Sequence, residues 1–362
     1  MIRRQATAAA MTLLMATGGS ACGGLFCQNT PVDQAAERII FTINPNRTIT
    51  AYVQINYTGS APDFSWVVPV PDVPTVDVAE IDSFDELSSL TRPVFVPPRE
   101  PLCARVRELD RDFESLRFSS VAAESVVEVL AQGTAGPYGF EVVRSDDPDA
   151  LIDWLNEHRY RITPPMEPLV HAYTAEGSLF LAMRLQEAEG ASTQDIQPVV
   201  MTYAGTVPTI PIRLTAVAAT PDMSVLTWVF ADSQVAPGNY ANPIIDERNL
   251  RNAPFQSSGT NYLQLVDMTV DLFGGQALVT EYAQATDTFL IDSQPGDPLV
   301  VHLARKYDYV TRLFGRMSPG EMSLDPTFVP VPDRPNVSNV RDLSRMNPRV
   351  YWGCTEKPIR IG

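Results

Sequence analysis

The 362-residue sequence is poor in the residues and motifs that usually carry enzymatic chemistry. It has three histidines and four cysteines, and its only lysines are Lys306 and Lys357. No segment matches His-Glu-x-x-His, Gly-x-Ser-x-Gly, or a phosphate-binding loop that ends in Gly-Lys-Ser or Gly-Lys-Thr. The sequence therefore lacks the usual signatures of zinc peptidases, α/β-hydrolases and nucleotide-binding enzymes.

The three histidines give no evidence of a catalytic site. His158, His171 and His302 lie in different segments, and none has metal-ligand spacing to another. A single histidine on a helix is more often structural, so we predict no catalytic residues. An exported hydrolase whose site is assembled from distant residues, with His171 or His302, is the alternative.

Positive charge is also scarce, because 27 basic residues face 43 acidic ones and the net charge is −16. Such acidity repels phosphate backbones, so we expect no nucleic-acid partner, whereas cationic ligands stay possible. The densest acidic groups are Asp146, Asp147, Asp149 and Asp153, and Glu80, Asp82, Asp85 and Glu86. Neither group matches a calcium-binding loop, and we predict no metal site and no cofactor.

The N-terminus has the pattern of an export signal. Arg3 and Arg4 precede an apolar run at 8–16, and small residues at 17–21 lead to Cys22. This order is typical of a secretory signal peptide, and the run is shorter than the roughly 20 residues that span a bilayer. We predict a signal peptide at 1–21, a periplasmic or extracellular location, and no transmembrane helix in the mature chain.

Cys22 has two interpretations. Residues 19–22 resemble a lipoprotein signal, in which an acylated Cys22 would anchor the protein to a membrane. The even number of cysteines instead suits two disulfides in an oxidising compartment, because acylation of Cys22 leaves an odd number of thiols. We expect Cys22 to pair with Cys27 and Cys103 with Cys354, and lipidation of Cys22 is the alternative.

Residues 22–92 form the first predicted unit, which is rich in β-strands. The segments 39–43 and 48–57 flank a turn at 44–47, and the alternation of apolar and polar residues in the second predicts a hairpin. A third extended segment at 64–71 contains prolines, which confine it to a sheet edge or strand end. A short helix is expected at 83–90. Residues 93–125 follow as a proline-rich connector and an amphipathic helix.

Residues 126–317 form the second predicted unit, an α+β region. We expect strands at 126–131, 138–143, 179–186, 210–214 and 224–230, the last of them central because both its faces are apolar. Asp147-Pro148 and Asp297-Pro298 are typical helix starts, and the second opens a predicted long helix at 298–314. A helix at 261–272 and a strand at 277–282 lie between them. Residues 318–362 read as a proline-rich C-terminal tail.

The fold class predicted from these patterns is α+β, with two β-rich units of mainly antiparallel strands and packed helices. Trp66 and Trp154 lie beside apolar runs, where they either line a ligand groove or, as is more usual for such residues, belong to the core.

Several short motifs together resemble one bacterial family. They are Cys22-Gly-Gly-Leu-Phe-Cys27, Trp66-Val-Val-Pro-Val-Pro71, Leu151-Ile-Asp-Trp-Leu155 before Tyr160, Gly274-Gly-Gln-Ala-Leu-Val-Thr-Glu-Tyr-Ala283, and Thr311-Arg-Leu-Phe-Gly-Arg-Met317 ahead of Asp325-Pro326. In this order they resemble secreted bacterial proteins classed as domain of unknown function twenty-three-thirty, over nearly the whole mature chain. The resemblance implies export and a shared fold, and it supplies no catalytic residues.

The function predicted from the sequence is non-catalytic. The absence of catalytic motifs and the export signal favour a binding or structural protein of the bacterial cell envelope, with a cell-envelope or protein partner that the sequence does not identify. The exported hydrolase remains the alternative.

Overall fold

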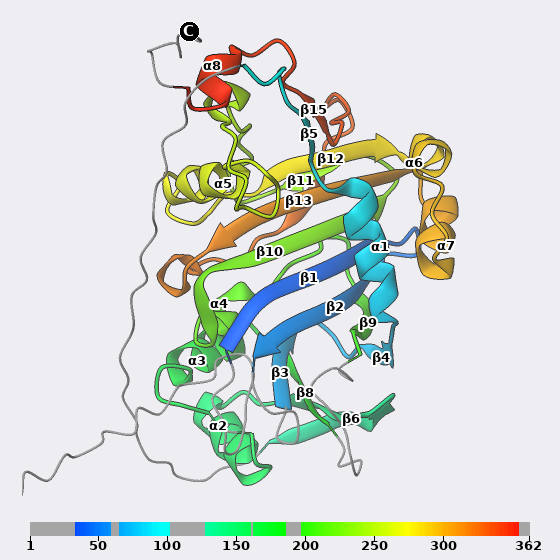
Figure 1. Cartoon of the computed structure of the whole chain (residues 1–362). Coiled ribbons are helices and arrows are strands. Elements are labelled where there is room, and N and C mark those ends of the chain that lie inside the picture. Colours follow the sequence, from blue (N-terminus) through cyan, green and yellow to red (C-terminus); the bar gives the residue numbers. More distant parts are fainter. Residues whose placement is uncertain (1–32, 59–64, 102–126, 161, 186–196, 355–362) are drawn as a thin grey trace, which may run out of the picture.

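The computed structural model describes residues 33–58, 65–101, 127–160, 162–185 and 197–354, and the predicted signal peptide and the predicted helix after Pro101 lie outside them. The described residues form fifteen strands and eight α-helices in mostly antiparallel sheets (Figure 1). The predicted α+β class is confirmed.

A seven-stranded sheet is the centre of the molecule (Figure 1). In sheet order its strands are β12 (Val279–Ala285), β13 (Tyr309–Met317), β10 (Ala219–Ala231), β1 (Asp33–Ile43), β2 (Thr48–Thr58), β9 (Val199–Ala204) and β4 (Thr75–Val78). The predicted hairpin is confirmed as β1 and β2, and β10 is central as its two apolar faces predicted. β1 pairs with β10 in parallel, whereas its pairing with β2 is antiparallel.

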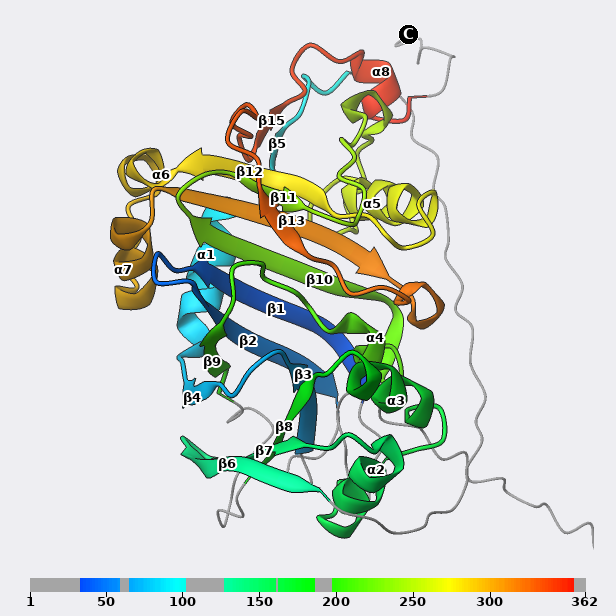
Figure 2. The same cartoon turned by 180° about the vertical axis from the view of Figure 1, so that it is seen from behind.

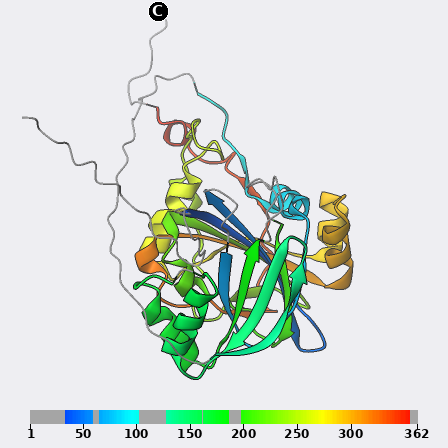
Figure 3. The ribbon, with the colours of Figure 1, turned by 90° about the horizontal axis from the view of Figure 1, so that it is seen from below.

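A four-stranded antiparallel sheet packs against this large sheet. Its strands, in order, are β3 (Ser65–Val70), β8 (Leu179–Leu185), β7 (Tyr138–Arg144) and β6 (Glu128–Ala135), and they lie side by side in Figure 3. β3 is an edge strand, as its proline predicted. Alternate residues of β8 point to opposite sides, because Leu181 and Met183 join the main core whereas Phe180 and Ala182 join a second core. The second core lies under α2 (Pro148–Glu157) and α3 (Glu167–Ala175).

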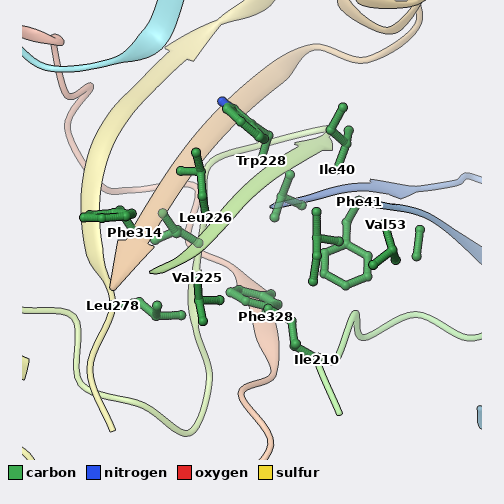
Figure 4. Packing of buried hydrophobic residues seen from close by; sticks show 14 of the residues in the cluster. Ile40, Phe41, Val53, Ile210, Val225, Leu226, Trp228, Leu278, Phe314 and Phe328 are labelled. Carbon is green, nitrogen blue, oxygen red and sulfur yellow. The ribbon is translucent and has the colours of Figure 1, made fainter. Parts of the chain in front are cut away.

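The opposite face of the large sheet is covered by α1 (Ile81–Thr91). Phe84 of α1 lies edge-on to Trp228 of β10, and the indole nitrogen of Trp228 donates to the Thr91 hydroxyl at 2.9 Å. Figure 4 shows Trp228 and Ile40 on this side of the sheet, with Phe41 and Phe328 on the other. The period-two alternation of strand side chains therefore builds an apolar layer on each face of the sheet.

The remaining elements lie around these layers (Figure 2). They are β5 (Val94–Val96), α4 (Ile212–Thr215), β11 (Val235–Pro237), α5 (Tyr262–Asp271), α6 (Thr286–Ser293), α7 (Pro298–Lys306), β14 (Phe328–Pro330), β15 (Val340–Asp342) and α8 (Pro348–Tyr351), with 3₁₀ turns at Glu247–Asn249 and Pro319–Glu321. β14 pairs with β11 and β15 with β5, so the proline-rich tail is attached to the body by two small sheets.

Two predicted elements are wrong. The predicted long helix ends at Lys306, and the chain continues as β13, which pairs with β10 and β12 on either side. The spacing of Leu303, Tyr307, Val310 and Phe314 fits a helix, but aromatic and β-branched residues from 309 to 311 favour a strand that has partners on both sides.

The strand expected at 210–214 is instead the helical turn α4. Pro211 has no N–H to donate to a sheet ladder, and five alternating residues are too few to separate a strand from a turn. β6 also extends beyond the strand predicted at 126–131, because it continues to Ala135 and leaves only Gly136 and Pro137 before β7.

Candidate functional site

A cleft between the two sheets is the principal candidate site. Its volume is about 390 Å³, within the range of small-molecule sites, which is roughly 300–1,000 Å³. We call it the inter-sheet cleft. Its lining residues come from β1, β2, β3, β9, the end of α3, the loop 204–211 and Asp325 of the tail.

The large sheet supplies an apolar wall of this cleft. Ile39 and Phe41 of β1, Ala51 and Val53 of β2, and Met201 of β9 line it, and each is at most 6% exposed. The antiparallel register puts Ile39 opposite Val53 and Phe41 opposite Ala51. Because directly paired residues project from the same face of a sheet, the alternation seen in the sequence places these side chains together.

β3 supplies the facing wall. Trp66, Val68 and Val70 line the cleft, while the intervening Val67 points away into the second core. Trp66 is therefore both a core residue, 5% exposed, and a wall of the cleft. Trp154 has only the core role that was expected, because it packs in the second core and stacks on His158 with ring centroids 3.8 Å apart.

A charged network lies at one end of the cleft. Tyr173 and Glu176, at the end of α3, and Asp325 line the cleft, and Arg213 of α4 contacts all three. Its guanidinium donates to Glu176 at 2.9 and 2.6 Å and to Asp325 at 3.1 Å, and it lies over the Tyr173 ring at 4.1 Å. The Tyr173 hydroxyl donates to Asp325 at 2.8 Å. One arginine thus fixes the geometry of two carboxylates.

The environment sets the protonation of this network. Burial, and then the Asp325 carboxylate, raises the pKa of Tyr173, while hydrogen bonds from Arg213 lower the pKa of Glu176. Burial raises the pKa of Tyr203, which lies on the wall from β9. At neutral pH the cleft therefore presents neutral phenols and an ionised Glu176.

Among the described residues that line the cleft, the acidic side chains outnumber the basic ones. Glu37, Glu176 and Asp325 line it, and Glu37 is only 4% exposed on β1. The only basic side chain in the network at its end is Arg213. A neutral apolar molecule fits this lining, and a cationic end group would be attracted to the carboxylates, whereas an anion would be repelled.

The histidines do not contribute to the cleft. His171 Nε2 lies 2.9 Å from Asp149 Oδ1, but these side chains are 44% and 79% exposed. His158 contacts the Trp154 carbonyl oxygen at the end of α2, and His302 lies on α7. None of the three lines the inter-sheet cleft.

The acidic groups that the sequence singled out include several with structural partners. Asp147 caps α2 by accepting from two backbone N–H groups, Asp85 pairs with Arg38 at 2.6 Å, and Glu86 accepts from the backbone N–H groups of Gly296 and Asp297. In the described ranges no three His, Cys, Asp or Glu side chains are placed to hold a metal ion.

The predicted disulfides fall largely outside the described residues, which exclude Cys22, Cys27 and Cys103. Cys354 follows α8, where its backbone N–H donates to the carbonyl oxygen of Arg349. Both pairings and the lipidation of Cys22 stay predictions.

No sequence motif joins Tyr173, Arg213 and Asp325, because they are far apart in the chain. Asp325 stood in the Asp325-Pro326 motif of the family resemblance, but nothing in the sequence linked it to the other two. Trp66 is the lining residue of the cleft for which the sequence did offer a groove role, as the alternative to a core role.

Comparison with known proteins identifies one family. The model of a family described as uncharacterized protein conserved in bacteria (DUF2330) matches residues 17–329, a segment that contains every residue lining the inter-sheet cleft. No curated protein and no solved structure matches the chain. Within the described residues, each helix is too short or too polar to cross a membrane.

Proposed function

The chain belongs to DUF2330, a family of uncharacterized proteins conserved in bacteria that it matches across the whole lining of the inter-sheet cleft, and we propose that this cleft binds a ligand. The protein is then a non-catalytic binding protein. Its place of action in this proposal is the bacterial cell envelope, on the basis of the N-terminal export pattern.

The chemistry of the lining defines the ligand class. Aliphatic and aromatic side chains form both long walls, so the body of the ligand is apolar. The carboxylates of Glu37, Glu176 and Asp325 favour a neutral or cationic end group. A long-chain amine or an aromatic amine has both properties.

Binding is a better proposal than hydrolysis. A hydrolase requires a base beside the bound substrate, and the histidine with a nearby carboxylate, His171, lies on an exposed surface beside Asp149. The cleft lining combines an apolar interior with few polar groups, as in many small-molecule binding sites.

The experiment measures displacement of a neutral fluorescent probe, N-phenyl-1-naphthylamine, from the purified protein. We expect dodecylammonium to displace it at lower concentration than dodecanoate. Ala51→Leu places three extra carbon atoms in the cavity and should lower the affinity of the probe by up to about 50-fold. This corresponds to about 2.4 kcal/mol, at about 0.8 kcal/mol for each carbon atom.

The matched control is Ile152→Val, a core change on α2 in the second core, which should leave probe affinity unchanged. Absence of probe binding, or equal affinity in Ala51→Leu and the unchanged protein, would rule out the inter-sheet cleft as the site. A preference for dodecanoate would refute the proposed charge selectivity.

A further inference from the structure

A second cleft lies beside β12, at the edge of the large sheet opposite to β9 and β4. Its volume is about 570 Å³, and we call it the edge cleft. Figure 2 shows β15 and β5 above β12 in this part of the molecule. The walls come from the loop 242–250, from Tyr262 of α5, and from the tail at 334–341.

The edge cleft has an apolar interior. Phe95, Ile245, Leu250 and Val279 line it, and the rings of Phe95 and Tyr262 pack with centroids 5.3 Å apart. Ile244 also lines it with its side chain 93% exposed. An exposed isoleucine beside buried apolar side chains can extend the contact surface for the body of a ligand.

Two arginines give this cleft its charge. Arg334 and Arg341 both line it, and Glu247 is the only acidic residue among the described residues of the lining. In a protein of net charge −16, a cleft with more basic than acidic side chains is locally unusual. Its charge is opposite to that of the inter-sheet cleft.

The arginines retain capacity to bind an anion. Arg334 is exposed and donates from Nη1 to the amide oxygen of Asn242, and no carboxylate in the described ranges lies within ion-pair distance of it. Arg341 donates to the Glu281 carbonyl oxygen at 3.1 Å, and its Nε is 3.8 Å from Glu247. A guanidinium has five N–H donors, so both side chains have donors left for a carboxylate.

We propose that the edge cleft is a second binding site, which takes an organic anion with an apolar body and holds its carboxylate with Arg334 and Arg341. The apolar body lies against Phe95, Ile245 and Leu250. This site goes beyond the proposed function, because it differs in position and in the charge that it selects. Its tail wall lies beyond residue 329, where the family match ends.

The experiment uses a matched pair of probes, 2-naphthylacetate and 2-(2-naphthyl)ethylammonium, with binding measured by isothermal titration calorimetry. Arg334→Gln should weaken binding of 2-naphthylacetate at least tenfold, because it removes the charge-assisted hydrogen bonds from one of the two guanidinium groups to the carboxylate. Arg334→Lys should recover part of the affinity, and added salt should weaken binding of the anion. Because Arg334 is exposed, its replacement should leave the fold intact.

Two controls separate this site from others. Arg248→Gln removes an exposed arginine that pairs with Asp246 nearby but does not line the cleft, and it should not change 2-naphthylacetate binding. Ala51→Leu should weaken binding of 2-(2-naphthyl)ethylammonium to the inter-sheet cleft and leave binding of 2-naphthylacetate unchanged. The two proposed sites can therefore be refuted independently. No binding of 2-naphthylacetate at millimolar concentration, or the same affinity in Arg334→Gln, would overturn the proposal.

Discussion

The replacement of Ala51 by leucine tests whether the space between the sheets is a true cavity. Ala51 is 2% exposed on β2 and lines the inter-sheet cleft. In a packed core the larger side chain would be forced against its neighbours. In a cleft of about 390 Å³ it has room. The sign of the change in the free energy of unfolding therefore distinguishes the two situations.

The expected magnitude follows from the carbon atoms added. Leucine has three more carbon atoms than alanine, and at about 0.8 kcal/mol each their burial contributes up to about 2.4 kcal/mol. Fixing the leucine rotamer costs about 0.5–1 kcal/mol. We expect Ala51→Leu to raise the free energy of unfolding by about 1–2 kcal/mol.

Ala182→Leu is the matched control. Ala182 is also on a strand and is 0% exposed, but it lies in the second core and does not line the cleft. The same three carbon atoms should there lower the free energy of unfolding by about 1–3 kcal/mol through overpacking. Urea unfolding followed by tryptophan fluorescence measures both variants. If Ala51→Leu is destabilised as much as Ala182→Leu, the cavity is not available to a side chain and the reasoning fails.

Further predictions concern burial and export. Burial raises the pKa of Tyr203, so the stability that depends on its neutral form is lost as pH rises above 10, and this share of the loss is about 1.4 kcal/mol by pH 11. Other buried tyrosines contribute losses of their own, so between pH 9 and pH 11 Tyr203→Phe should lose about 1.4 kcal/mol less than the unchanged protein. Glu281→Gln should lower the free energy of unfolding by about 3–5 kcal/mol, because Arg312, whose Nε lies 2.6 Å from the Glu281 carboxylate, stays buried and charged. A loss below about 1 kcal/mol in urea unfolding would contradict this. A non-reduced digest should link Cys103 to Cys354. The intact mass of the exported protein should match an unacylated chain that begins at Cys22.

The structure gives a reason to expect the Cys103–Cys354 pairing. The indole nitrogen of Trp352, two residues before Cys354, donates to the carbonyl oxygen of Pro98, five residues before Cys103, at 3.0 Å. The strands β5 and β15, which pair in parallel, precede these two residues in the two segments.

Local signals predicted much of the fold correctly. The hairpin of β1 and β2 follows from alternation, and Asp147 and Asp297 cap α2 and α7 with their side chains. Each of these features depends on neighbours within a few residues, so the sequence carries the information directly.

The prediction of one long helix over 298–314 was wrong because distant partners decide the structure of its second half. Residues 309–317 have apolar spacing that continues the pattern of α7, and only pairing with β10 and β12 makes them a strand. The local spacing of apolar residues does not show which distant strands will pair with a segment. Such pairing can override the local preference for a helix.

The candidate sites depend even more on the tertiary structure. Tyr173 and Arg213 are brought to Asp325 by the packing of α3, α4 and the tail, and Arg334 reaches the edge cleft because the tail folds back along β12. The sequence by itself determined the class of fold, the family and the excess of negative charge, since these follow from composition and local order. Only the tertiary structure decided where apolar walls leave space and which charges line it, because both depend on contacts between residues far apart in the chain.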